Sequence, residues 1–232
     1  MQTLHLAVVD ADGGQSDLEF PVARILDAGF TGKNREGAMK HVEELKAHGV
    51  AAPDRIPAYF AVTREMVTTD DEIEVLGDDT SGEVEVVFLF KGDEVYIAVG
   101  SDHTDRELEK DSIPKSKVIC AKVVSREVWK LADVKPHWER LKLQSWIDVD
   151  GQRTLYQEGS LADFLTVDDF LDGVRSVVKD GALDGMVLYM GTMPSLGGEL
   201  LFSPTFEGRL SDDVLGRELS FRYSIRPIDW LA

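Results

Sequence analysis

The chain has 232 residues, 43% of them hydrophobic, which is enough for a sizeable core, and no shift in composition divides it into halves. Its 43 acidic and 25 basic residues give a formal net charge of −18, so phosphate backbones and anionic membranes are repelled. Nucleic acid and membranes are therefore not expected as partners. We predict one domain over residues 1–232, in which residues 1–30 form an N-terminal hairpin extension.

The cysteine content and the amino terminus bear on where the protein works. Cys120 is the single cysteine, so no internal disulfide forms and a reducing compartment is expected. Residues 1–14 lack the cationic start and apolar stretch of a secretion signal, and no run of about 18 apolar residues occurs. These features predict a cytoplasmic protein.

The first elements predicted in chain order are a hairpin and a helix. Residues 4–9 and 18–22 have strand character and flank a break that contains Gly-Gly, which indicates a hairpin. Residues 35–48 place apolar side chains at helical spacing, and Gly49 stands where a helix commonly ends. This is the clearest helix in the first part of the chain.

The rest of the chain is richer in strands than in helices. Residues 83–90 and 95–99 flank a turn that contains Gly92, which predicts an antiparallel pair at the centre of the sheet. The other predicted elements are strands at 59–62 and 73–76, a helix at 125–132, a hairpin at 146–156, a helix from Thr166 or Asp168 to 178, and strands after it. This pattern predicts an α+β fold and not an array of βαβ units.

Glu83 and Glu85 stand two apart in the predicted central strand, so both carboxylates share one face with Val87 and Leu89. Acids at the edge of a core need a cation or hydrogen bonds, and their oxygens suit Mg²⁺, Mn²⁺ or Ca²⁺. The alternative is a solvated strand end.

A short polar cluster follows the partner strand. Asp102 lies seventeen residues after Glu85 and offers a third carboxylate, with His103 and Asp105 beside it. The same residue types also suit a helix start capped by Ser101, Asp102 or Thr104, so a ligand and a cap are both open.

Two further features could carry chemistry. His41 and Glu44 share a helix face, where the carboxylate could orient the imidazole as a general base, although such pairs also occur on ordinary surfaces. The glycine-rich stretch 190–198 could present backbone N–H groups to an anion or be a plain connection. It lacks the lysine of a nucleotide-binding loop, which excludes nucleotide binding of that kind.

Taken in order, these fragments resemble the fumarylacetoacetate hydrolase superfamily from about residue 30 to the end. The matching segments are Gly32-Lys-Asn followed by His41-Val-Glu-Glu44, then Gly82-Glu-Val-Glu-Val-Val, Ser101-Asp-His-Thr-Asp-Arg106, Trp146, Asp150-Gly151, Tyr156-Gln157 and Gly191-Thr-Met-Pro194. The likeness is to a compact, poorly characterised prokaryotic branch. It implies a mixed β-roll with flanking helices, usually a homodimer.

The resemblance also implies roles for single residues. The divalent metal, Mg²⁺ or Mn²⁺ with Ca²⁺ possible, would be held by Glu83, Glu85 and Asp102. The remaining implied site residues are His41 and Glu44 as base and partner, Lys117 as the active-site lysine with Lys115 as the competing match, and Arg106, Gly191 and Thr192 as contacts to a small carboxylate substrate.

The implied activity is cleavage of a C–C bond in a 2-oxo or β-diketo acid by a metal-dependent hydrolase. A metal-dependent lyase on a 2-oxo acid, either a decarboxylase or a hydratase, needs the same ligands, and a metabolite-binding member without turnover is the third alternative. The sequence departs from the family where Glu109 replaces a common Gln, where the lysine after Phe60 is missing, and where the interval from Glu85 to Asp102 is short. These departures leave the substrate open.

Overall fold

The computed structural model describes residues 2–36, 39, 53 and 55–230. The helix predicted at 35–48, with His41 and Glu44, lies almost entirely outside these residues.

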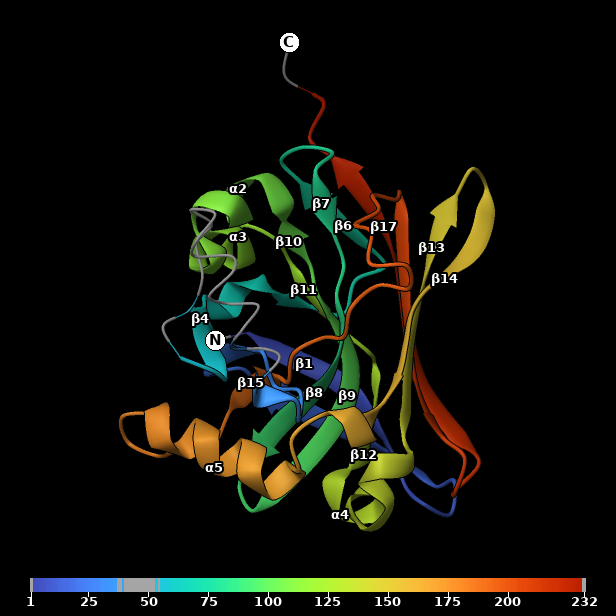
Figure 1. The fold of residues 1–232 in the computed structure, drawn as a ribbon. Helices are drawn as coiled ribbons and strands as arrows, with labels where there is room; N and C mark the ends of the chain where they lie inside the picture. Colours follow the sequence, from blue (N-terminus) through green and yellow to red (C-terminus); the bar gives the residue numbers. More distant parts are fainter. Residues whose placement is uncertain (1, 37–38, 40–52, 54, 231–232) are drawn as a thin grey trace.

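A mixed ten-stranded sheet forms the larger layer of the fold (Figure 1). The strand order along its main path is β2-β1-β12-β9-β8-β15-β3-β4. Strand β11 lies off this path and pairs with β9 and with β5. The strands are β1 (Thr3–Val9), β2 (Gln15–Pro21), β3 (Arg24–Gly29), β4 (Ala58–Val62), β5 (Val67–Thr68), β8 (Val84–Lys91), β9 (Glu94–Asp102), β11 (Lys122–Val124), β12 (Glu127–Lys130) and β15 (Met186–Tyr189). The predicted N-terminal hairpin and the predicted β8–β9 pair are both confirmed.

A second sheet of five strands packs beside the first, in the order β14-β13-β16-β17-β6 (Figure 1). Its strands are β6 (Glu72–Val75), β13 (Lys142–Val149), β14 (Gln152–Ser160), β16 (Thr205–Asp212) and β17 (Arg217–Pro227), and a small pair is formed by β7 (Thr80–Ser81) and β10 (Thr104–Asp105). Asp150 and Gly151 both have positive φ, the geometry of a tight hairpin turn, which confirms the hairpin predicted there.

Short helices connect and cover the sheets. They are α2 (Arg106–Asp111), α3 (Ile113–Val118), α4 (Leu131–Val134) and α5 (Val167–Val177), with 3-10 turns η1 (Arg64–Met66), η2 (Lys135–Arg140) and η3 (Leu161–Asp163). Thr166 caps α5 by accepting from the backbone N–H of Asp169, so the first of the two predicted starts is the observed one. The fold is therefore α+β, dominated by sheets and with few helices, as expected.

The helix predicted at 125–132 is wrong in position. Residues 127–130 instead form β12, because Val128 and Trp129 are fully buried where that strand pairs with β1 and β9. Ser125 caps no helix, since its hydroxyl donates to the carbonyl of Glu127 (2.8 Å). The helix α4 begins only at Leu131.

Strand β8 is buried on both faces, which explains its nearly continuous apolar sequence. Val84, Val86 and Phe88 point into the core shared with the smaller sheet, whereas Val87 and Leu89 pack in the second core with β1 and β2. Glu85 shares the second face by strand alternation. The fold thus places a carboxylate inside a packed sheet.

The strand crossing at Gly100 leaves no room for a side chain. A Cβ there would lie 2.5 Å from the Val123 carbonyl oxygen and 2.8 Å from Val87 Cγ2.

We predict that Gly100→Ala lowers the free energy of unfolding by about 1–3 kcal/mol, measured by urea denaturation. Gly77→Ala is the control, because a Cβ there meets nothing within 4 Å. Equal midpoints for the two variants would contradict the packing argument.

Candidate metal centre

The register of the β8–β9 pair brings the first two carboxylates together. Val84 pairs with Ser101, so Glu83 and Asp102 face each other one step further on, and the Asp102 N–H donates to the Glu83 carbonyl (3.0 Å). Strand β11 continues the row, because Lys122 pairs with Asp102. A spacing of nearly twenty residues in sequence thus becomes a contact.

Glu85 completes a cluster of three carboxylates. Oxygen atoms of Glu83, Glu85 and Asp102 all lie within 4.8 Å of one another. Glu85 and Asp102 are buried, while Glu83 is partly exposed. The backbone N–H of Gly191 donates to Glu85 Oε2 (2.7 Å) and holds that carboxylate in place.

Two lysines supply positive charge to the cluster. Lys117, on α3, contacts Asp102 Oδ2 and lies 3.4 Å from Glu83 Oε2, so its ammonium bridges two of the three carboxylates. Lys122 is fully buried, lies 2.9 Å from Asp102 Oδ1 and donates to the carbonyl of His103 (2.7 Å). Both oxygens of Asp102 are thereby engaged.

Arg106, the first residue of α2, ties the cluster to that helix. Its guanidinium reaches Glu83 Oε1 (3.1 Å), Glu109 Oε2 (2.8 Å) and Ser81 Oγ (2.7 Å). Burial would lower the pKa of Arg106, but Glu83 and Glu109 raise it above its ordinary value. Arg106 is therefore a fixed cation between two carboxylates.

The polar cluster after β9 divides into separate roles. Asp105 caps α2 by accepting from the Leu108 N–H (2.8 Å), so Asp102 is not the cap. His103 is buried and hydrogen-bonded through both ring nitrogens, to Tyr223 (2.8 Å) and Thr80 (2.9 Å), and burial lowers its pKa to about 3. Of this cluster, Asp102 alone faces the other carboxylates.

Asp27, on β3, is a further buried acid that interacts with this cluster. Neither of its carboxyl oxygens has a hydrogen-bond partner among the described residues. Burial, followed by the negative charge of Asp102, raises the pKa of Asp27 to about 8. The same two causes hold the pKa of Glu85 well above its ordinary value. Asp102 differs, because Lys117 and Lys122 outweigh its burial and hold its pKa at about 2.

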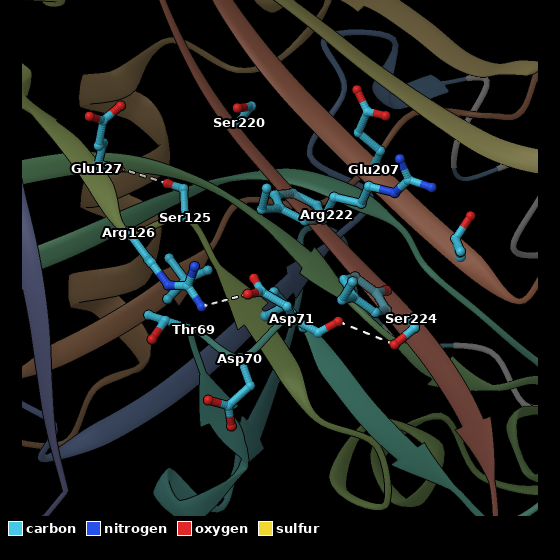
Figure 2. A pocket seen from close by; sticks show the side chains of 15 residues that line it. Thr69, Asp70, Asp71, Ser125, Arg126, Glu127, Glu207, Ser220, Arg222 and Ser224 are labelled. Atoms are coloured by element: carbon cyan, nitrogen blue, oxygen red, sulfur yellow. Dashed lines mark hydrogen bonds and ion pairs between the residues drawn. The ribbon is translucent and has the colours of Figure 1, made fainter. Parts of the chain in front are cut away.

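A cleft of about 610 Å³ opens onto the cluster. Its charged lining residues are Glu83, Glu85, Arg106, Glu109 and Lys117. A larger groove of about 870 Å³ lies elsewhere, between β17 and the turns before β6 and β12 (Figure 2). Among the residues described, the groove holds no group of three potential metal ligands, and its Arg126 is paired with Asp71 (3.0 Å). The smaller cleft is therefore the candidate site.

The donor set of this cleft fits a hard divalent cation. Carboxylate oxygens are the ligands that Mg²⁺, Mn²⁺ and Ca²⁺ prefer. The ammonium of Lys117 already lies between Glu83 and Asp102, so positive charge is stabilised at this point. Asp27 adds a buried carboxyl without a partner among the described residues.

A sequence profile matches residues 28–223, which include all the residues that line the cleft. The chain belongs to the family described as "Protein of unknown function (DUF2848)". No curated protein matches it in sequence. Within the described residues, no helix of this family member is long and apolar enough to cross a membrane.

Solved structures resemble this family member in fold. A 2-keto-3-deoxy-D-arabinonate dehydratase, complexed with magnesium and 2,5-dioxopentanoate, has a TM-score of 0.65 at 14% identity and is aligned over 91% of this chain and 76% of its own. A 4-oxalocrotonate decarboxylase from Pseudomonas putida G7, complexed with magnesium and adipate, has a TM-score of 0.54 at 12% identity over 88% and 77%. A calcium and acetate complex of that decarboxylase gives 0.53 at 14% identity over 88% and 76%. The likeness is one of fold, and it supports the expected fumarylacetoacetate-hydrolase-like architecture.

The remaining predicted site residues differ in whether they lie at the carboxylate cluster and whether their polar groups are free to contact a ligand. Lys117 lies in the cluster, whereas Lys115 is exposed, which favours the first of the two matches. Gly191 and Thr192 line the cleft, but the N–H of Gly191 is used by Glu85 and the hydroxyl of Thr192 donates to the Val84 carbonyl (2.9 Å). The roles of all these residues stay predictions.

Two residues of the cluster were missed in the sequence. Asp27 and Lys122 join it through sheet pairing that no local spacing reveals, although an acid in the apolar strand RILDAG is itself a signal. Gln157, which the resemblance included without a role, is buried and fixes the loop after β15, donating to Thr192 Oγ1 (2.9 Å) and to the Met193 carbonyl (2.6 Å).

The raised pKa of Asp27 predicts how the metal-free protein responds to pH. Between the ordinary value of 3.8 and about 8, the folded state binds this proton more tightly than the unfolded chain does, so the free energy of unfolding falls as pH rises through that window. Asp27→Asn removes this loss and should stabilise chelator-treated protein by roughly 1–3 kcal/mol at the upper end of the window.

Urea denaturation across that pH window measures the effect. Asp17→Asn, an exposed acid on β2, is the control and should leave the pH dependence unchanged. An Asp27→Asn profile parallel to that of the wild type would contradict the burial argument.

Proposed function

We propose that this protein is a divalent-metal-dependent lyase that removes water or carbon dioxide from a 2-oxo acid. The observation that carries the proposal is the cluster of Glu83, Glu85 and Asp102, because Glu83 and Glu85 line a cleft together with Lys117, which contacts the buried Asp102. The dehydratase and the decarboxylase that share the fold support the lyase over the hydrolase. The hydrolase alternative depends on His41 and Glu44 as the base, and these lie outside the described residues.

Glu83, Glu85 and Asp102 would hold the metal, which supplies a Lewis acid that polarises the 2-oxo oxygen and stabilises developing negative charge. Lys117 keeps its proton, because Asp102 and Glu83 outweigh burial and hold its pKa well above the ordinary value. It would therefore act as a cationic donor to a substrate oxygen and not as a base. Arg106 fixes Glu83 from the opposite side of its carboxylate.

Several finer features belong to the same proposal. A cytoplasmic location is supported by the acidic composition and the single buried thiol of Cys120. The single domain, the homodimer, the β-roll and the prokaryotic branch remain predictions from the sequence and its resemblance.

Metal binding has a direct thermal test. Mn²⁺ or Mg²⁺ at about a hundred times its dissociation constant should raise the melting temperature of chelator-treated protein by about 5–10 °C. The Glu83→Ala, Glu85→Ala double variant should show no rise. Glu72→Ala, Glu74→Ala is the matched control, because it removes the same alternating pair from the exposed face of β6 and should respond like the wild type. An unchanged response in the first double variant would remove the metal site.

The reaction type is read from product masses. Metal-loaded protein incubated with 2-keto-3-deoxy sugar acids, unsaturated 2-oxo acids and β-diketo acids should yield a product that has lost water or carbon dioxide. Lys117→Met should lower turnover about a hundredfold. Two fragments that together have gained water would establish the hydrolase instead, and tight binding without any product would establish a metabolite-binding protein.

A further inference from the structure

The cations that line the cleft are both committed to carboxylates of the protein. Among the described lining residues these cations are Arg106 and Lys117. Lys117 is paired with Asp102 and Glu83, and Arg106 is paired with Glu83 and Glu109. Neither is therefore an uncompensated partner for an additional anion.

Glu109 is the carboxylate of this set that lies outside the three-carboxylate cluster. It lies one helical turn after Arg106, and its Oε2 accepts from Arg106 Nη1 at 2.8 Å. The side chain is partly exposed and lines the same cleft as the metal-ligating candidates. A carboxylate in place of an amide neutralises the guanidinium that would otherwise face the ligand.

The charges at the site set how many carboxylates a ligand can bring. The carboxylates of Glu83, Glu85, Asp102 and Glu109 carry four negative charges, and three positive charges come from Arg106, Lys117 and Lys122. The net charge is therefore −1 without a metal and +1 with a bound divalent metal. One substrate carboxylate balances it, whereas a second carries uncompensated charge into a partly buried cleft.

The rest of the described lining suits an uncharged tail. Apolar side chains are mixed with amides and hydroxyls, including Phe60, Ile113, Tyr156, Gln157 and Ser195. Glu109 itself offers acceptor oxygens, which match a ligand hydroxyl and repel a ligand carboxylate. The cleft thus combines one anion site with a hydrogen-bonding wall whose described cations are already paired with carboxylates.

We propose that Glu109 selects the substrate class: 2-oxo acids with one carboxylate and an uncharged, hydroxylated tail, against 2-oxo dicarboxylates. This rests on the proposed function, since it assumes that the 2-oxo acid end binds at the metal. Glu109 acts as a specificity residue through its charge, both on Arg106 and on the ligand.

Two probes of equal length separate the alternatives, because 5-hydroxy-2-oxopentanoate and 2-oxoglutarate differ only in a terminal hydroxymethyl or carboxylate. Calorimetry on the Mn²⁺-loaded protein should show at least about tenfold tighter binding of the hydroxy acid. Glu109→Gln keeps an acceptor for Arg106 and should reduce that ratio about tenfold, mainly by tighter binding of 2-oxoglutarate. Glu107→Gln is the matched control: it removes the same charge from an exposed position of α2, paired with Lys110, and should leave the ratio unchanged.

The outcomes distinguish the inference from the function beneath it. If the wild type binds both probes equally, or 2-oxoglutarate more tightly, the inference is overturned whatever the variants do. An unchanged ratio in Glu109→Gln, or an equal change in Glu107→Gln, also overturns it. If neither probe binds the wild type while Mn²⁺ does, the 2-oxo acid function fails and the inference fails with it.

Discussion

The arrangement of side chains around the candidate metal centre depends on the repulsion between buried carboxylates. Glu85, Asp102 and Asp27 are all buried, and beside burial itself the charge of Asp102 raises the pKa of both Asp27 and Glu85. Such a group is tolerated only with compensating charge. The chain supplies that charge from the segment that directly follows β9, where Lys117 and Lys122 reach the cluster. Helices α2 and α3 and strand β11 thus supply the positive charge that neutralises the carboxylates at the start of β8 and the end of β9.

The parts of the site that the sequence predicts are those governed by local periodicity. The two-residue period of a strand puts Glu83 and Glu85 on one face, and the turn at Gly92 returns the chain so that Asp102 meets them. The expected cluster of three carboxylates is confirmed, and its oxygen atoms fit the divalent metal that the sequence predicts. The choice between cap and ligand for Asp102 required the structure, since Asp105 caps the helix.

Long-range pairing accounts for what the sequence does not reveal. Asp27 arrives through the parallel pairing of β3 with β15, and Lys122 through the pairing of β11 with β9. Neither partner can be inferred from spacing along the chain. The misplaced helix at 125–132 has the same origin: Ser125 resembles a cap, but burial of Val128 and Trp129 within the sheet outweighs that local preference.

The position of Lys117 has a consequence for how a divalent metal would bind. Its ammonium acts as a built-in counter-ion for Glu83 and Asp102, so the fold does not depend on an external ion to keep them together. Binding of a divalent ion to these carboxylates would then be an exchange in which the ammonium of Lys117 gives up contacts with Glu83 and Asp102. The affinity for the ion would then equal its attraction to the carboxylates minus the attraction that Lys117 loses. Monovalent ions would bind weakly, because they bring no more charge than the lysine already does.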